Sequence, residues 1–124
     1  MQVLESTVGS QSEDFRTNAE AMETHITTFR DVEQKVLDLA EAAREKFTKR
    51  GKLLPRDRIN RLLDRGTPFL ELCSLAGYKM HDDKDGSMAG GGIIAGIGYV
   101  SGIRCLVVAS NSAIKGGTIT PAGL

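Results

Sequence analysis

Two consecutive β-rich runs constrain the fold of this chain more than any other feature. One covers residues 92–100, the other covers residues 103–110, and only Ser101 and Gly102 separate them. A two-residue connection that contains glycine is typical of a tight antiparallel hairpin. Little polar alternation survives in either run, so we expect both faces of the hairpin to be covered. The three glycines of the first run leave room for a second layer or a ligand to approach closely.

A long helical pattern precedes the hairpin. Apolar residues recur every three or four positions from Phe15 to Phe47, which predicts one continuous helix with a single apolar stripe. Ser12 suits the N-cap, Gly51 suits the left-handed position after the last turn, and residues 1–11 are expected to form a flexible arm. Such a helix would be about 50 Å long. We therefore expect much of its stripe to pack on something outside this chain.

Shorter elements connect the long helix to the hairpin. Pro55 marks the first turn of a second helix and Gly66 lies past its end, while residues 68–72 predict a short strand. A polar, glycine-rich loop follows over residues 77–91. Two helices cannot bury both faces of a sheet, so we expect the chain to be cut short, and a partner chain that completes the fold is the alternative.

These elements predict three stretches of chain. They are a flexible arm (residues 1–11), a helical segment (residues 12–66) and a set of strands (residues 67–124). The fold class is α/β, with an α+β arrangement inside this piece.

Composition excludes several classes of function. The chain of 124 residues has 16 basic and 16 acidic side chains, so no global field draws it to nucleic acid or to a membrane. The apolar run at residues 89–100 is too short and too rich in glycine to span a bilayer. Cys73 and Cys105 lie in apolar runs without C-x-x-C spacing, which predicts buried free thiols. The N-terminus does not resemble a signal peptide, and we expect a cytoplasmic protein.

Charge is unevenly distributed within this neutral chain. Residues 44–65 contain nine basic and three acidic side chains, a local net charge of nine minus three, or +6. The run fits a solvated helix face, and it also fits a patch that binds a phosphorylated ligand. Its one aromatic residue is Phe47, on the apolar side of the helix, so the run offers no exposed aromatic surface on which nucleic acid bases could stack.

Three motifs carry little chemistry. The pattern Gly90-x-Gly92-x-x-Ala95 matches the dinucleotide fingerprint in letters, but it opens a strand where the mechanism requires a helix. The stretch of residues 83–86 resembles part of a calcium loop without the glutamate ligand, which favours a solvated turn. His25 and His81 lack the spacing of a zinc site, and we expect no metal.

A glycine-containing turn near the end of the chain is the clearest candidate site. Lys115, Gly116, Gly117 and Thr118 follow a buried-type strand. Two glycines expose backbone N–H groups, and a lysine and a hydroxyl lie beside them, so the turn could receive an anion or a carbonyl oxygen. A plain surface turn is equally compatible with these residues.

Taken in order, these segments resemble the start of the β (carboxyltransferase) subunit of biotin-dependent acyl-CoA carboxylases. The resemblance covers residues 13–124, and within the family it is greatest for the branch that acts on 3-methylcrotonyl-CoA and geranyl-CoA. Residues 77–86 and 117–124 favour the geranyl-CoA type. The matching segments are residues 50–59 (RGKLLPRDRI), 61–64 (RLLD), 69–72 (FLEL), 90–98 (GGGIIAGIG), 100–102 (VSG) and 114–118 (IKGGT).

The resemblance implies a crotonase-like (ClpP/crotonase) fold and a ligase. In that family, a carboxyl group passes from biotin, carried on a partner α subunit, to an α,β-unsaturated acyl-CoA through an enolate held by backbone N–H pairs. The glycines of those pairs are expected beyond residue 124, so this piece alone is expected to hold no catalytic residue and to be inactive. The implied substrate-binding residues are Arg50, Lys52, Lys115, Gly116, Gly117 and Thr118. A homo-oligomer of β subunits is also implied.

Two alternatives stay open at this point. The chain could be a non-catalytic helical interaction module, whose apolar helix stripe docks a partner and whose basic segment binds RNA or an anionic surface. It could also belong to a decarboxylase or transcarboxylase subunit with the same carboxyltransferase fold, because the choice of biotin partner is encoded elsewhere.

Overall fold

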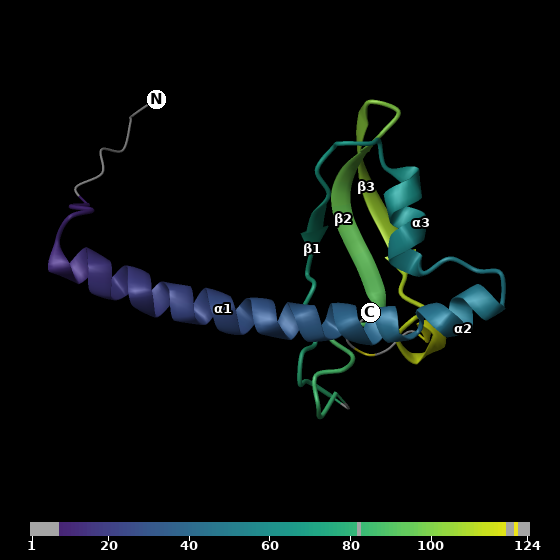
Figure 1. Cartoon of the computed structure of the whole chain (residues 1–124), viewed down its shortest axis with the longest axis horizontal. Helices are drawn as coiled ribbons and strands as arrows, with labels where there is room; N and C mark the ends of the chain where they lie inside the picture. The colour runs from purple at the N-terminus through teal and green to yellow at the C-terminus, as the bar shows by residue number, and fades with distance from the viewer. Residues whose placement is uncertain (1–7, 82, 119–120, 122–124) are drawn as a thin grey trace. The chain divides into compact units, whose positions relative to one another are not determined.

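The computed structural model describes residues 8–81, 83–118 and 121 (Figure 1). The chain divides into two units, residues 1–31 and residues 32–124, and each is described by itself. The predicted order of long helix, short helix and strands is confirmed, with a further short helix after the long one. In chain order the elements are α1 (Glu13–Ala42), α2 (Arg44–Lys49), α3 (Pro55–Leu62), β1 (Leu70–Leu72), β2 (Ile93–Val100), β3 (Ile103–Ser110) and the helical turn η1 (Lys115–Gly117).

Helix α1 begins where its sequence predicts and ends earlier. The Ser12 hydroxyl accepts a hydrogen bond from the backbone N–H of Phe15 at 3.2 Å, which confirms the N-cap. The prediction of one uninterrupted helix as far as Phe47 is wrong. Helix α1 ends at Ala42, the N–H of Ala43 donates to the carbonyl of Ala40 three residues back, and a new helix starts at the next residue.

The apolar stripe of α1 has two different environments. In the first unit, Phe15, Met22, Ile26 and Phe29 are exposed to between 39% and 59%. In the second unit, Val36 and Ala40 are buried, and Val36 packs with Ala89 and Ile114. The expected packing of the exposed stripe on something outside the chain stays a prediction, as does the flexible arm, whose residues 1–7 lie outside the described residues.

The predicted hairpin is confirmed. Strands β2 and β3 pair antiparallel over their full lengths, from Ile93 opposite Ser110 to Val100 opposite Ile103. Ser101 and Gly102 both have positive φ, 53° and 77°, the conformation of a type I′ turn that matches the twist of the strands. Strand β1 pairs antiparallel with the other edge of β2, giving the order β1-β2-β3.

Helix α3 covers one face of this sheet (Figure 1), and the segment after it binds the hairpin turn. Ile59 of α3 packs with Ile94 and Val107, with Leu63 and Phe69 around them. Helix α3 ends at Leu62, four residues before Gly66, because the chain becomes extended at Leu63. The extended segment continues to Asp64, whose carboxylate accepts hydrogen bonds from the N–H groups of Ser101 and Gly102 at 2.8 and 2.7 Å.

The opposite face of the sheet is largely exposed among the described residues. Leu70, Ile97 and Leu106 are directly opposite one another across the three strands, so their side chains share this face. Leu70 and Leu106 are 61% and 67% exposed, and Val108 beside them is 61% exposed. Among the described residues, α3 packs on one face alone, in line with the expectation that the helices of this chain cannot bury both faces, and a cover from outside the chain stays a prediction.

The loop between β1 and β2 is built around a buried carboxylate. Asp83 is 3% exposed and accepts hydrogen bonds from the N–H groups of Lys79 and Met88 at 2.9 and 3.0 Å. Met88 and Ala89 are buried as well. The prediction of a solvated turn at residues 83–86 holds for Lys84 and Asp85, which are exposed, and is wrong for Asp83, which organises the loop as an acceptor for backbone amides.

The cysteines are free, as predicted, but they are not buried. Cys73 is exposed and Cys105 is half-buried. Over the part of the chain that the structure describes, no helix is long and apolar enough to cross a membrane.

Candidate anion-binding site

A concave site with four cationic side chains and no carboxylate lies in the second unit. We call it the basic pocket. Its volume is about 490 Å³, and its lining residues are Lys46, Phe47, Arg50, Lys52, Ser112, Ala113, Lys115 and Gly116. Two segments far apart in the sequence, α2 with its C-terminal turn and the chain around η1, therefore form one site.

On the α2 side of the basic pocket, backbone hydrogen bonds hold the end of the helix together with the residues that follow it. Gly51 has φ of 64°, and its N–H donates to the carbonyl of Thr48 at 2.9 Å, while the N–H of Lys52 donates to the carbonyl of Phe47 at 2.9 Å. These two bonds form the Schellman pattern that ends many helices. The pattern fixes the backbone of Lys52 relative to α2, so Lys46, Arg50 and Lys52 project from one backbone support.

The η1 side of the basic pocket is a strained turn. Lys115, Gly116 and Gly117 have φ of 43°, 68° and 82°, three consecutive left-handed residues. For a lysine this conformation costs about 1 kcal/mol or more. Such outliers persist where the surrounding structure imposes them, and they cluster at functional sites.

The predicted exposure of backbone N–H groups in this turn holds in part. The N–H of Gly117 donates to Ile114 and the N–H of Thr118 donates to Lys115, at 3.0 and 3.4 Å. The N–H of Gly116 has no hydrogen-bond partner among the described residues. Gly116 lines the basic pocket together with Lys115, whereas Gly117 and Thr118 are not among its lining residues.

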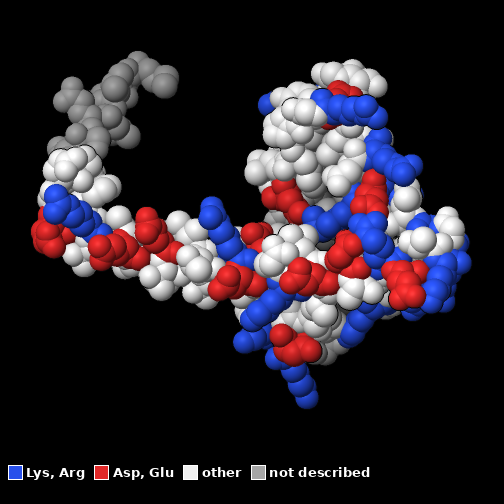
Figure 2. All heavy atoms as spheres, viewed as in Figure 1, with Lys and Arg blue, Asp and Glu red and all other residues white. Residues whose placement is uncertain are grey.

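Three of the nine basic residues in the run 44–65 form ion pairs, and three others, Lys46, Arg50 and Lys52, line the basic pocket. Arg44 and Arg56 form ion pairs with Asp57 and Glu71 at 2.7 and 2.6 Å, and Lys49 pairs with Glu45 at 2.6 Å. In contrast, the three cations that the run contributes to the basic pocket form no ion pair with the described residues. Figure 2 shows the resulting surface, where Lys and Arg side chains gather over α2 and α3 with carboxylates between them.

Charge on the η1 side is partly balanced. Hydrogen bonds from Ser87 lower the pKa of the Asp85 carboxyl, and the nearby positive charge of Lys115 adds to this effect. Asp85 is not among the lining residues, so the basic pocket keeps its positive sign.

Four of the eight lining residues of the basic pocket, Lys46, Phe47, Ser112 and Ala113, were not in the sequence prediction of the site. Lys46 belongs to the basic run, and its spacing of four residues from Arg50 places both on one helix face, which was an available signal. Phe47, Ser112 and Ala113 had no distinguishing pattern around them. Of the six predicted residues, the structure brings Arg50, Lys52, Lys115 and Gly116 together in this pocket.

This arrangement suits a ligand with several negative charges. Four cations, the Ser112 hydroxyl and the Gly116 amide can surround phosphate oxygens, for which Lys and Arg provide charge-assisted hydrogen bonds. The turn does not offer a pair of free backbone amides, because the N–H groups of Gly117 and Thr118 donate to carbonyls of the same turn. Among the described residues, no group of three side chains could hold a metal ion.

Comparison with known proteins identifies the family. Residues 46–124 match the carboxyl transferase domain. The chain is 43% identical over 120 residues to a probable methylcrotonoyl-CoA carboxylase beta chain, mitochondrial, of Drosophila melanogaster, which covers 96% of this chain and 20% of that protein. It is 53% identical over 81 residues to the biotin-dependent 3-methylcrotonyl-coenzyme A carboxylase beta1 subunit of Mycobacterium tuberculosis, which covers 65% of this chain and 15% of that protein.

Solved structures agree with this assignment. The β subunit of the P. aeruginosa geranyl-CoA carboxylase is 61% identical, with a TM-score of 0.84 over 98% of this chain and 22% of that chain. A transcarboxylase 12S structure, 23% identical, shares the fold with a TM-score of 0.64 over 78% of this chain and 19% of that chain. The chain spans about a fifth of the length of its longest-matching relatives. The predicted crotonase-like α+β arrangement is thereby confirmed, and the chain belongs to the carboxyl transferase domain family.

Proposed function

We propose that this chain is part of the carboxyltransferase subunit of a biotin-dependent acyl-CoA carboxylase, and that its basic pocket binds the phosphates of the acyl-CoA. One observation carries this proposal: four cationic side chains from two distant segments line a single pocket that contains no carboxylate. CoA carries a 3′-phosphate and a diphosphate, so its head group presents the clustered negative charge that such a pocket attracts.

The acyl group that we propose is geranyl, with 3-methylcrotonyl as the alternative. The identity of 61% to the geranyl-CoA carboxylase β subunit supports geranyl-CoA, compared with 43% and 53% to the methylcrotonyl-CoA relatives. The proposed reaction transfers a carboxyl group from carboxybiotin to the α,β-unsaturated acyl-CoA. A comparison of kcat/KM for the two acyl-CoA substrates in the complete enzyme discriminates between them.

The partners that we propose follow from the same family. Biotin is carried on a separate α subunit, and β subunits assemble into a homo-oligomer. The described residues hold no paired amides for biotin at the basic pocket, so no step of the transfer is assigned to them. The cytoplasmic location stays a prediction.

The test uses the complete subunit with Lys52→Ala and Lys115→Ala, one from each side of the basic pocket. A lysine that binds a phosphate contributes about 1.5 kcal/mol, so each variant should raise the KM for acyl-CoA about tenfold with kcat retained. Arg65→Ala is the matched control, because Arg65 is an exposed cation of the same basic run outside the pocket. Its KM should not change.

Pantetheine gives a second control, because it is the part of CoA without phosphates. Binding of CoA should weaken in both lysine variants and with added salt, whereas binding of pantetheine should respond to neither. If both lysine variants keep the KM of the unmodified subunit, the basic pocket does not bind CoA phosphates.

A further inference from the structure

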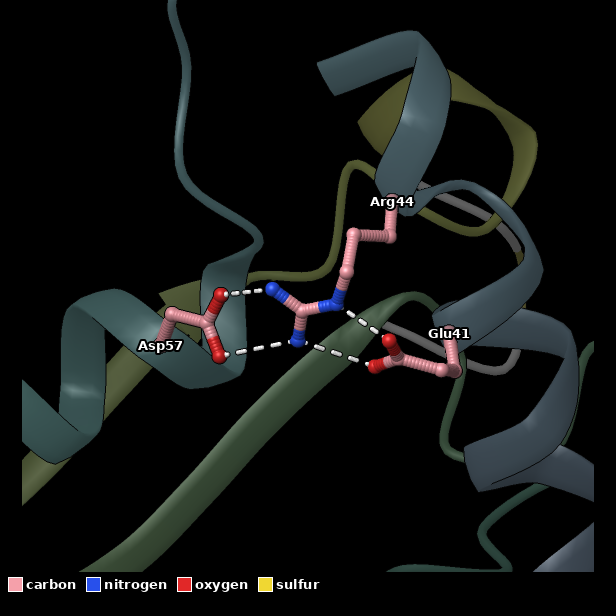
Figure 3. Close-up of polar contacts among 3 residues, drawn as sticks. All are labelled: Glu41, Arg44 and Asp57. Atoms are coloured by element: carbon pink, nitrogen blue, oxygen red, sulfur yellow. Dashed lines mark hydrogen bonds and ion pairs between the residues drawn. The ribbon is translucent and has the colours of Figure 1, made fainter. Parts of the chain in front are cut away.

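Within the second unit, Arg44 connects the last turn of α1 with α2 and α3 by ion pairs to two carboxylates, which we call the Arg44 clamp (Figure 3). Its Nη1 and Nη2 donate to the Asp57 carboxylate at 2.7 and 3.2 Å. Its Nη2 also donates to Glu41 at 2.9 Å, and its Nε pairs with the other oxygen of Glu41. Glu41 belongs to the last turn of α1, Arg44 is the first residue of α2, and Asp57 lies in the first turn of α3.

The hydrogen bonds of the Arg44 clamp shift the pKa values of all three groups. Hydrogen bonds from Arg44 lower the pKa values of both the Glu41 and the Asp57 carboxyl groups, and the bonds to Glu41 and Asp57 raise the pKa of the guanidinium. Each group is therefore in its charged form at neutral pH.

Helix α2 has few other attachments. It is six residues long, and none of its residues is buried. Phe47 is half-buried, and the Lys49–Glu45 ion pair lies within the helix itself. A helix this short is not stable by itself in water, so its position depends on the contacts it makes with the rest of the chain. Among the described residues, the Arg44 clamp is the set of ion pairs that ties α2 to both of its neighbouring helices.

The clamp and the basic pocket lie on different sides of α2. At about 100° per residue, Lys46 and Arg50 are about 200° and 240° around the helix from Arg44. Arg44 therefore does not line the basic pocket, in agreement with its absence from the lining residues. Lys52 is joined to the same helix by the Schellman bonds of Gly51 and Lys52. Three pocket cations thus share one support, and that support is held from its other side by Arg44.

We propose that Arg44 is a positioning residue for substrate binding. By clamping α2 between Glu41 and Asp57, it holds Lys46, Arg50 and Lys52 at the distances at which they can share the phosphates of one acyl-CoA. This inference rests on the proposed function of the basic pocket. It predicts that Arg44 affects affinity for CoA only through the α2 cations, and that Lys115, which stands on η1, is independent of it.

The test is a double-mutant cycle on CoA binding to the complete subunit. Arg44→Ala should weaken CoA binding about tenfold and leave pantetheine binding within about twofold of the unmodified subunit. Lys52→Ala should cost about tenfold alone and less than about twofold when Arg44→Ala is present, because the misplaced lysine no longer contributes. Lys115→Ala should cost about tenfold in either background. A merely structural role of Arg44 would not produce this selective coupling.

Two further variants keep the test decisive if Arg44→Ala does not fold. Asp57→Asn keeps the shape of the side chain and removes its charge, and it should reproduce the coupling with Lys52 at a smaller size, because Glu41 still binds Arg44. Arg44→Lys keeps the charge, but one ammonium cannot form the two-pronged bonds to both carboxylates, so affinity should be restored only in part.

Three results overturn the inference. They are full additivity of Arg44→Ala with Lys52→Ala, an equal loss of CoA and pantetheine binding, and unchanged CoA affinity in Arg44→Ala. If Lys52→Ala and Lys115→Ala still weaken binding in that case, the proposed function stands and only the role of Arg44 is refuted. If neither lysine matters, the proposed function of the basic pocket fails as well.

Discussion

Replacing Gly96 by alanine would bring a methyl group against the backbone of the neighbouring strand. A Cβ at this position would lie 2.7 Å from the carbonyl oxygen of Leu70 and 2.3 Å from Cζ of Phe69. Ordinary van der Waals contacts begin near 3.4 Å. Phe69 can turn only within the packed cluster under α3, and the carbonyl of Leu70 belongs to the strand that pairs with Gly96. Strand β1 must therefore shift.

The expected loss of stability in Gly96→Ala is the difference between an overpacking cost and an entropy gain. Overpacking of this kind costs about 3 kcal/mol. Because the φ of Gly96 is not positive, alanine fits the backbone, and its lower entropy in the unfolded chain returns about 1 kcal/mol. The net loss of about 2 kcal/mol corresponds to about a 30-fold rise in the opening equilibrium of β1.

Gly98→Ala is the matched comparison. Its Cβ would approach Cδ2 of Leu63 at 2.5 Å, the end of a flexible side chain, so the cost should be about 1 kcal/mol and the net change close to zero. Gly9→Ala, with no atom within 4 Å of the added Cβ, is the control without contact.

Hydrogen exchange of the native complete subunit, followed by mass spectrometry, measures the effect locally. A peptide that covers residues 69–72 should exchange about 30-fold faster in Gly96→Ala and at an unchanged rate in Gly98→Ala and Gly9→Ala. An unchanged rate in Gly96→Ala, or a larger effect of Gly98→Ala, would refute the argument that a backbone contact excludes the methyl group.

Two further predictions concern the polar contacts around α3. Asp64→Ala removes the acceptor for the amides of Ser101 and Gly102, so the hairpin turn should lose about 1–2 kcal/mol of local stability, measurable as faster exchange of these two amides. The Arg44 clamp should be insensitive to pH above about 5, because the folded pKa values of Glu41 and Asp57 lie below their usual 4.5 and 3.8. A lowered folded pKa contributes stability above the unfolded pKa, and this stability is lost as the pH falls through the folded pKa. The difference in unfolding temperature between the unmodified subunit and Asp57→Asn should therefore be constant from pH 8 to pH 5 and should shrink below about pH 4; a constant difference at all pH values would contradict this cause.

The elements set by local chemistry were predictable from the sequence. Ser101-Gly102 between two β-rich runs specifies a type I′ turn by itself, and Ser12 and Pro55 mark helix starts by groups within one turn. The break at Ala43 was not predictable in this way. Alanine is the best helix former, and the apolar stripe continues through Ala43, so no local signal marks the end of α1. The interruption lies next to Arg44, which contacts Asp57, a residue 13 positions away in the sequence.

The same distinction applies to the site. The types and positions of Arg50, Lys52 and Lys115 suggested anion binding, but their convergence depends on the path of the chain between α2 and η1, which no local pattern encodes. Asp83 illustrates the converse case. Its neighbours Lys84 and Asp85 are polar and exposed, yet its own carboxylate is buried because two backbone amides of the same loop point at it.

Because one face of the sheet is uncovered, the stability of this segment depends on the concentration of whatever binds that face. Anything that binds this face in the folded segment, and not in the unfolded chain, raises the free energy of unfolding by an amount set by its concentration and its Kd. A binding partner present at a hundred times its Kd adds about 2.7 kcal/mol to the free energy of unfolding. Substitution of Leu106, which is 67% exposed, should then change stability mainly through the occupancy of the cover and little through contacts inside the segment.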